Sequence, residues 1–162
     1  MPNNAASVTN IVIAGLGGQG VLTASDIVAD VAFHAGLEVK KSEVHGMSQR
    51  GGSVASDIRY GTKVFSPMVA RGEADYLVVT SSDQVPVNEA VLAPKGVIIE
   101  ESQVDVNKLA TKKAINVALL GLLSKHLPFT EEQWIAALER NFPEKLHEGN
   151  RAAFSLGRNG GR

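Results

Sequence analysis

The first third of the chain opens with a short apolar run followed by an amphipathic segment. Residues 8–14 are rich in β-branched side chains and end at Gly15, which is typical of a buried strand. Residues 19–35 carry apolar side chains at helical spacing, and Gly36 suits the end of that helix. The apolar positions of this helix are Val21, Ala24, Val28, Val31 and Ala35. The pattern predicts a strand, a glycine-rich turn and a helix that buries one face.

Further segments along the chain have the patterns of strands. Residues 37–42 and 53–60 favour strands, the second because apolar and polar side chains alternate, and residues 63–66 could pair back on it. Residues 74–80 and 96–100 contain continuous apolar runs bounded by turn residues, as strands covered on both faces do. Because strands that alternate with helices favour a parallel sheet, we expect an α/β fold with a Rossmann-like, mostly parallel sheet flanked by helices.

The last third of the chain has helical patterns. Residues 114–123 are apolar on nearly every side, which predicts a buried helix. Thr130 and Gln133 have the spacing of a capping box, so a helix that carries Trp134 should follow. Pro143 suits the first turn of a final helix. We therefore expect a helical C-terminal third.

Composition narrows the possible functions. No linker divides the 162 residues, so we expect a single domain over residues 1–162, with loose ends at 1–9 and 158–162. The sequence has no Cys, which excludes disulfides, a cysteine nucleophile and cysteine-ligated iron–sulfur clusters within this chain. The formal net charge of -1, without a dense basic run, argues against a nucleic-acid partner. No secretion-signal pattern or bilayer-length apolar run is found, so we expect a cytoplasmic protein with no membrane partner.

Three glycines directly after the first strand have the spacing GxGxxG. Gly15, Gly17 and Gly20 lie between a predicted strand and a predicted helix, where this motif binds a diphosphate through backbone amides and the positive end of the helix. Gly18 and Gln19 add flexibility and an amide side chain. We take these five residues as candidate cofactor-binding residues. The alternative is a glycine turn that only lets the strand and helix pack closely.

A second polar, glycine-rich segment spans residues 42–53. It follows a strand that should end at the same sheet edge as the first glycine turn, so the two loops are expected to converge on one crevice. Its candidate cofactor-binding residues are Arg50, Gly51, Gly52 and Ser53. Arg50 offers a fixed fork for phosphate or carboxylate, or else it ties its own loop to a neighbouring acid. His45 is a weaker candidate, because a lone His in a loop more often has a structural hydrogen bond.

Four other residues are weaker candidates for ligand contacts. Lys40 and Lys41 lie near the expected end of the second strand, where cations suit a phosphate-bearing nucleotide such as coenzyme A or NADP, although paired lysines are also common at a solvated edge. Thr80 follows an apolar strand, where ligand-facing residues gather, but it also suits a helix cap. Asn116 lies within an apolar helix and could orient a loop or a ligand, but the default interpretation is a buried amide bonded to backbone. We assign no catalytic residue and no metal ligand.

Several motifs together resemble those of one enzyme family. They are Gly15-Leu16-Gly17-Gly18-Gln19-Gly20-Val21-Leu22, Ser42-Glu43-Val44-His45-Gly46-Met47-Ser48-Gln49-Arg50-Gly51-Gly52-Ser53-Val54, Ser66-Pro67 and Gly72-Glu73-Ala74-Asp75. They look like the gamma-type subunit of 2-oxoacid:ferredoxin oxidoreductases, the family of pyruvate, 2-ketoisovalerate and indolepyruvate ferredoxin oxidoreductases. The second motif most resembles the small subunit of the indolepyruvate enzyme. The similarity extends from about Asn10 to Gly157.

The resemblance implies a role within a hetero-oligomeric complex. Such complexes use thiamine diphosphate and iron–sulfur clusters to decarboxylate a 2-oxoacid oxidatively, form an acyl-coenzyme A and reduce ferredoxin. This chain resembles the subunit that carries neither thiamine diphosphate nor clusters, so both are expected on partner subunits. Coenzyme A binding and complex assembly are expected of this chain, which should be inactive alone; a homodimer of the isolated chain is left open. Between Glu100 and Ala114 the chain is shorter than the family usually is.

Two other functions are compatible with the same residues. An NAD(P)-binding Rossmann-type reductase would need a proton-donating catalytic set, and none is convincing in the sequence. A purely structural subunit would use the glycine loops as protein contacts. We favour the oxidoreductase subunit whose glycine loops line a coenzyme A site.

Overall fold

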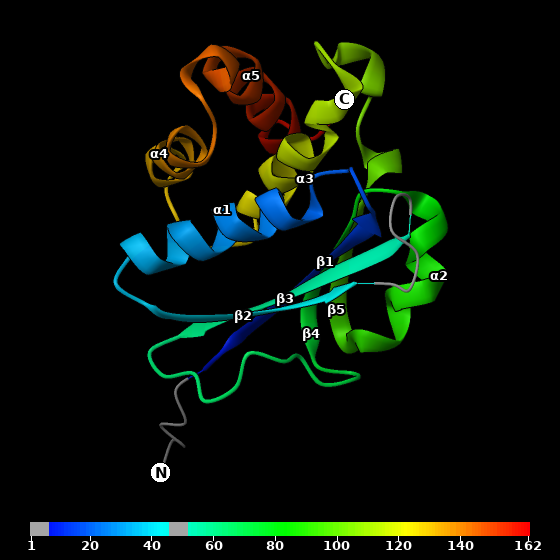
Figure 1. The fold of residues 1–162 in the computed structure, drawn as a ribbon, viewed down its shortest axis with the longest axis vertical. Helices are drawn as coiled ribbons and strands as arrows, with labels where there is room; N and C mark the ends of the chain where they lie inside the picture. The colour runs from blue at the N-terminus through cyan, green and yellow to red at the C-terminus, as the bar shows by residue number, and fades with distance from the viewer. Residues whose placement is uncertain (1–6, 46–51) are drawn as a thin grey trace.

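The computed structural model describes residues 7–45 and 52–162, which form a five-stranded sheet with the order β2-β3-β1-β4-β5 (Figure 1). The strands are β1 (Thr9–Leu16), β2 (Glu38–His45), β3 (Ser53–Gly61), β4 (Ala74–Val79) and β5 (Leu92–Glu100). β1, β4 and β5 pair in parallel, whereas β3 runs antiparallel to both β1 and β2. β2 therefore points the same way as β1, and four strands share one direction. The expected α/β fold is confirmed, and its sheet is mixed because β3 runs against the other four strands.

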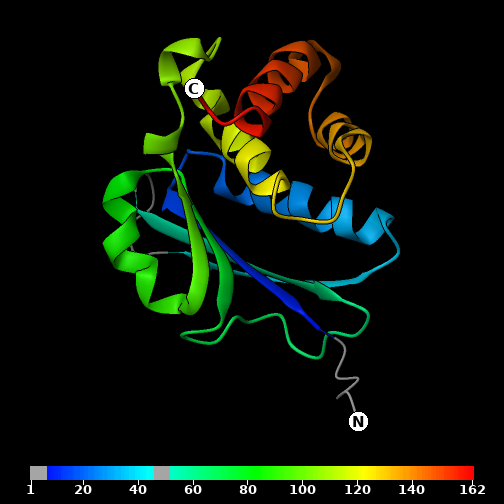
Figure 2. The ribbon, with the colours of Figure 1, turned by 180° about the vertical axis from the view of Figure 1, so that it is seen from behind.

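Helices cover the two faces of the sheet unequally (Figures 1 and 2). One face carries α1 (Val21–His34), α3 (Ile115–Ser124), α4 (Glu131–Asn141) and α5 (His147–Arg158) over the larger core. The other face carries the short α2 (Val85–Asn88) and the segment 62–73 over a smaller core. No helix in the described part of the chain has the length and apolar character needed to cross a membrane.

Two predicted helix ends are confirmed by their hydrogen bonds. Gly36 has a φ of +86°, and its N–H donates to the carbonyl of Phe33 at 3.0 Å. A left-handed residue of this kind ends a helix readily when it is glycine. The Thr130 hydroxyl accepts from the Gln133 N–H at 3.2 Å, while the Gln133 side chain accepts from the Thr130 N–H at 2.8 Å. Both signals are local, which is why the sequence shows them.

Close packing of α3 against α5 organises the helical layer. A Cβ on Gly157 would lie 1.8 Å from the carbonyl oxygen of Ala118, so the two helix backbones touch. Trp134 of α4 and Phe154 of α5 are fully buried beside this contact, with ring centroids 5.8 Å apart. Because α3 begins next to the glycine turn that follows β1, this packing also brings α5 close to that turn.

Three expectations about local structure differ from the fold. Residues 63–66 form no strand. Pro143 precedes a short 3₁₀ helix, Glu144–Leu146, and so stands before the final helix rather than in its first turn. At the C-terminus, expected to be loose, the Gly161 carbonyl accepts from the Asp105 N–H at 2.6 Å. The expectation of a single domain stays a prediction.

Candidate functional site

The glycine turn follows β1, and the strands that come later in the chain lie on both sides of β1 in the sheet. Residues 17–20 connect β1 to α1, and the chain then passes over β3 to reach β2. β4 pairs with the other side of β1. Ligands of open α/β sheets bind at such switch points. Gly18 and Gly20 adopt φ values of +89° and +74°, the left-handed region in which glycine is favoured.

The inner side of the turn is closed by a hydrogen-bonded pair of side chains. The Thr80 hydroxyl donates to Gln19 Oε1 at 2.7 Å, and the Leu16 N–H donates to the same oxygen at 2.9 Å. A Cβ on Gly15 would lie 1.8 Å from Thr80 Oγ1. Thr80 is only 1% exposed. Two of the candidate side chains, Gln19 and Thr80, therefore hold the turn in shape. Position 15 must be glycine because any side chain there would clash with Thr80.

Asn116 fastens α3 to the other end of the turn. Its Nδ2 donates to the Gly20 carbonyl at 3.2 Å, and its Oδ1 accepts from the Val117 N–H at 2.9 Å. A Cβ on Gly20 would lie 2.3 Å from Nδ2. The interpretation of Asn116 as a buried amide bonded to backbone is confirmed, and one of its partners is the turn itself.

The second glycine-rich segment reaches the turn, as expected. The Gly17 N–H donates to the Gly52 carbonyl at 2.8 Å. Ser53 pairs with Leu16 at the start of β3, and its hydroxyl donates to Gln84 Oε1 at 2.7 Å. The two loops therefore converge at Gly17, Gly52 and Ser53.

Three other candidates cannot be placed in the site. Arg50 and Gly51 lie outside the described residues, as does the side chain of His45. Their assignment to ligand binding stays a prediction.

Lys40 and Lys41 are not at the site, and their expected position at a strand end is wrong. β2 continues to His45, so Lys41 lies about 13 Å along the strand from its end. The Lys41 ammonium is paired with the Asp26 carboxylate and lies 3.2 Å from Glu43 Oε1. The strand extension and this pairing remove the reason for expecting a phosphate beside these two lysines.

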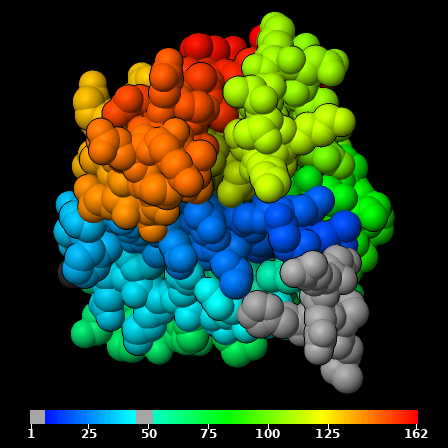
Figure 3. All heavy atoms as spheres, turned by 45° about the horizontal axis from the view of Figure 1, so that its top comes forward, coloured from blue at the N-terminus to red at the C-terminus, as the bar shows by residue number. Residues whose placement is uncertain are grey.

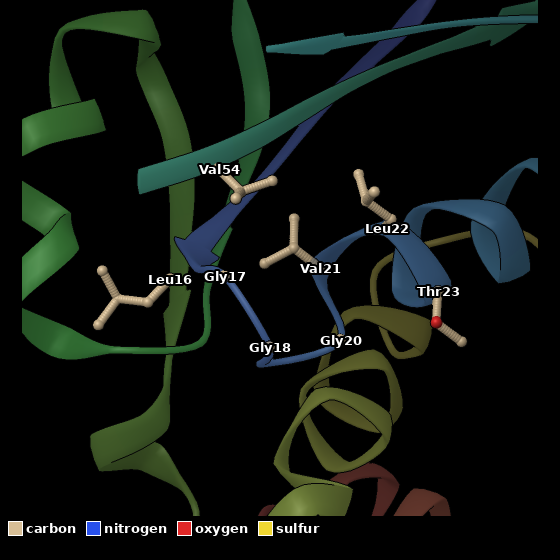
Figure 4. A pocket seen from close by; sticks show the side chains of 8 residues that line it. All are labelled: Leu16, Gly17, Gly18, Gly20, Val21, Leu22, Thr23 and Val54. Atoms are coloured by element: carbon tan, nitrogen blue, oxygen red, sulfur yellow. The ribbon is translucent and has the colours of Figure 1, made fainter. Parts of the chain in front are cut away.

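Three cavities meet at Gly18. The β3-side cavity, of about 320 Å³, has walls from Leu16, Val21, Leu22 and Val54 together with the turn (Figure 4). The α5-side cavity, of about 340 Å³, is lined by Gly18, Gly20, Lys113, Phe142, Leu146 and Asn150, among others. The β4-side cavity, of about 390 Å³, is lined by Gly18, Thr80, Glu101, Lys112 and Lys113, among others. The outer face of the glycine turn is thus the wall that all three share.

The N-terminus of α1 presents uncapped backbone to this region. Gly20 is the N-cap, no side chain caps it within the described residues, and the first turn contains no acidic residue. The first N–H groups of a helix lack intrahelical partners and carry the positive end of the helix dipole. Val21, Leu22 and Thr23 line the β3-side cavity at this end. The arrangement favours a phosphate or another anion next to Gly18.

Lys112 and Lys113 are two cations that line cavities beside the turn, and the site assignment from sequence missed them. They form a short 3₁₀ helix with Ala114 that leads directly into α3. Neither forms an ion pair with any other described residue. Cations at a helix N-terminus oppose the helix dipole. Two lysines directly before a predicted helix are therefore unfavourable for the helix itself, and this was the signal in the sequence that they bind something else.

The fold and site define an α/β protein with an anion-favouring glycine turn at the switch point of its sheet. The comparisons with known proteins agree. The family described as pyruvate ferredoxin/flavodoxin oxidoreductase matches residues 10–160. The chain belongs to this family.

Relatives and solved structures narrow the class. Subunit IorB of the indolepyruvate oxidoreductase of Thermococcus kodakarensis is 34% identical over 188 aligned positions, covering 91% of this chain and 93% of that protein. The gamma subunit of a keto/oxoacid ferredoxin oxidoreductase from Geobacter sulfurreducens has a TM-score of 0.73 at 22% identity, covering 94% of this chain and 98% of that one. The prediction of a gamma-type oxidoreductase subunit is confirmed.

A larger protein contains the same fold. The 2-oxoglutarate:ferredoxin oxidoreductase of Magnetococcus marinus, solved with 2-oxoglutarate, coenzyme A and succinyl-CoA bound, has a TM-score of 0.80 at 20% identity. The match covers 94% of this chain and 30% of that one. The alignment with the Thermococcus relative spans 188 positions, more than the 162 residues of this chain. The Thermococcus protein therefore contains residues that have no counterpart in this chain. The shortening expected between Glu100 and Ala114 stays a prediction.

Proposed function

We propose that this chain is the subunit without clusters or thiamine diphosphate in a complex that oxidatively decarboxylates a 2-oxoacid to an acyl-coenzyme A and reduces ferredoxin. Family membership and the subunit names of the relatives support this proposal. The sequence has no Cys, and the described residues contain no group of three or more His, Asp or Glu that could hold a metal ion. This chain therefore does not fit an iron–sulfur cluster, which belongs on partner subunits together with thiamine diphosphate.

Within the complex, this chain contributes a binding site for coenzyme A. The observation that carries this part is the position of Gly18, which forms the shared wall of three cavities beside the uncapped end of α1. Coenzyme A has a diphosphate in the middle of an extended molecule, with a nucleotide on one side and a pantetheine arm on the other. A diphosphate at Gly18 would allow both ends to enter cavities. The coenzyme A bound in the Magnetococcus structure supports the choice of ligand.

The matched pair Gly18→Ala and Gly36→Ala tests this site. Both glycines have positive φ, +89° and +86°, and at both a Cβ would meet nothing within 4 Å, so the backbone strain is alike. They stand at opposite ends of α1. In a complex reconstituted with the partner subunits, Gly18→Ala should raise the KM for coenzyme A, whereas Gly36→Ala should leave it unchanged. Equal KM values for the two variants would refute the binding site, although not membership of the complex.

Assembly is the second contribution that we propose, and a different face supports it. Phe65 and Met68, on the segment that covers the smaller core, are 83% and 62% exposed. Large apolar side chains this exposed, three positions apart on one segment, suit a protein contact. Phe65→Ser should reduce co-purification with the partner subunits without lowering Tm. The control is Phe33→Ser, a change at a side chain that is 67% exposed on α1. Unchanged co-purification for Phe65→Ser would show that this face does not contact the partner subunits.

A further inference from the structure

We propose that the α5-side cavity holds the adenosine phosphate end of coenzyme A, and that the pantetheine arm leaves through the β3-side cavity. This inference rests on the proposed function and adds the orientation of the ligand. It follows from three features of the α5-side cavity and from one contrast between the two cavities. The cavity lies where the start of α1, the segment before α3 and the connection between α4 and α5 meet on one face (Figure 3).

The first feature is a buried amide without a partner. Asn150 of α5 is 9% exposed and lines the cavity, and its Nδ2 has no hydrogen-bond partner among the described residues. Buried polar groups are nearly always paired, and an unpaired one calls for an explanation. The neighbouring amide, Asn116, differs in that both of its polar atoms are bonded to backbone. The ring nitrogens of adenine are acceptors that would satisfy Asn150.

The second feature is an apolar wall next to that amide. Phe142 and Leu146, from the connection between α4 and α5, line the cavity beside Asn150. Leu146 is 44% exposed although it is large and apolar. A flat base packs well against such side chains, and binding sites commonly combine apolar walls with a few placed polar groups. The exposure of Leu146 is then explained by a ligand contact.

The third feature is the charge of Lys113. Its side chain lies at the unfavourable end of α3, without an ion pair among the described residues. A lysine held there contributes little to stability but suits a phosphate group. Lys113 also lines the β4-side cavity, together with Lys112 and Glu101, but it does not line the β3-side cavity. Its charge therefore faces the side of the turn where we place the nucleotide.

The contrast between the two cavities sets the direction. Among the residues that the structure describes, those that line the β3-side cavity carry no charged side chain, and Leu16, Val21 and Val54 lie around the turn there (Figure 4). The pantetheine arm is uncharged and partly apolar, whereas the adenosine end carries phosphate. Each end of coenzyme A therefore matches one cavity, with the diphosphate at Gly18 between them.

Inhibition by the two halves of coenzyme A tests this orientation. In the reconstituted complex, adenosine 3′,5′-bisphosphate and phosphopantetheine are measured as competitors of coenzyme A. Lys113→Gln should raise the inhibition constant of adenosine 3′,5′-bisphosphate about tenfold and leave that of phosphopantetheine within about twofold. The control is Lys125→Gln, which changes an exposed lysine at the other end of α3 and should alter neither constant.

A second variant keeps the test independent of charge. Asn150→Leu removes an unpaired buried amide while nearly keeping its shape, so Tm should stay level or rise by about 2–4 °C. The same variant should raise the inhibition constant of adenosine 3′,5′-bisphosphate about fivefold. If Asn150 only served packing, Asn150→Leu would lower Tm and leave the inhibition constant unchanged.

The outcomes separate this inference from the proposed function. Unchanged inhibition constants in both Lys113→Gln and Asn150→Leu would overturn the orientation, even if Gly18→Ala still raised the KM for coenzyme A. A larger effect of Lys113→Gln on phosphopantetheine than on the nucleotide would also overturn it. If Gly18→Ala had no effect either, the coenzyme A site itself would fail.

Discussion

The two ends of α1 differ in how their backbone groups are satisfied. At the C-terminal end, Gly36 closes the helix with its own hydrogen bond, and Asp30 is bound by Arg140 and Asn141 of α4. At the N-terminal end, Gly20 is an N-cap that no side chain in the described part of the chain caps, and cavities lie beside it. At the first end the protein supplies the hydrogen-bond partners itself, whereas the first helical turn at the second end contains no acidic residue. An end that the protein leaves open in this way is available to an anionic ligand.

The electrostatics of Asp30 show how firmly the closed end is held. Burial raises the pKa of Asp30, but hydrogen bonds from Arg140 and Asn141 outweigh it and hold the pKa below the ordinary value of 3.8. The Asp30 side chain is 17% exposed, so solvent screens these bonds only partly. They connect α1 to α4 across the helical layer.

The largest expected effect on stability is at the open end. Gly20→Ala combines a φ of +74° with a Cβ placed 2.3 Å from the buried Asn116 amide. Left-handed strain of about 1–2 kcal/mol and overpacking of about 1–3 kcal/mol should together lower the free energy of unfolding by about 3 kcal/mol. Urea unfolding of the purified chain measures this loss. A loss below about 1 kcal/mol would show that the turn and α3 are not tightly coupled.

A smaller, pH-dependent effect is expected at the closed end. Asp30→Asn should lower the free energy of unfolding at neutral pH by about 1.5 kcal/mol, because the charge-assisted bonds are lost. The folded pKa of Asp30 is lowered, so its contribution is complete above the unfolded value of 3.8 and is lost as pH falls through the folded value.

The difference between wild type and Asp30→Asn should therefore shrink in acid. Unfolding curves at neutral pH and well below pH 3.8 measure this change. A difference that stays constant with pH would contradict the assigned role of the charge. The KM for coenzyme A should not change in this variant, since Asp30 lies at the far end of α1 from Gly18.

Thr80→Val should have a smaller effect again. Val keeps the shape but removes the hydroxyl that donates to Gln19 Oε1, while the Leu16 N–H still binds that oxygen. We expect a loss of about 1 kcal/mol in the free energy of unfolding and a moderate rise in the KM for coenzyme A, because the turn is held less firmly. Thermal unfolding and steady-state kinetics measure the two effects. A direct ligand contact by the hydroxyl would instead raise the KM strongly without loss of stability.

Local signals explain which parts of the structure could be predicted. The capping box at Thr130 and the glycine at position 36 act within a few residues, and both are confirmed. The glycine turn was recognisable because its motif directly follows an apolar strand. The convergence of Gly17 with Gly52 followed from the common direction of β1 and β2.

Long-range pairing explains what could not be predicted. The end of β2 is set by its register with β3, and the partner of Lys41 is Asp26 on α1, so the sequence around Lys41 shows neither. Asn150 reaches the site only because α5 packs closely on α3. Lys113 lies near Gly18 for the same kind of reason, through the contact between α3 and the turn.

The central claim is that the open end of α1 binds the diphosphate of coenzyme A, and one pair of variants tests it most directly. Thr23 is in the first turn of α1 and lines both the β3-side and the α5-side cavities. Thr23→Asp adds a negative charge that favours this end of the helix, so the isolated chain should be more stable by about 0.5 kcal/mol. The same charge should repel the diphosphate.

The decisive measurement is the KM for coenzyme A of the reconstituted complex with Thr23→Asp, compared with the nearly isosteric Thr23→Asn. We expect Thr23→Asp to raise the KM about tenfold or more and Thr23→Asn to change it by less than about threefold. Equal KM values for the two variants would contradict binding of the diphosphate at this end of α1.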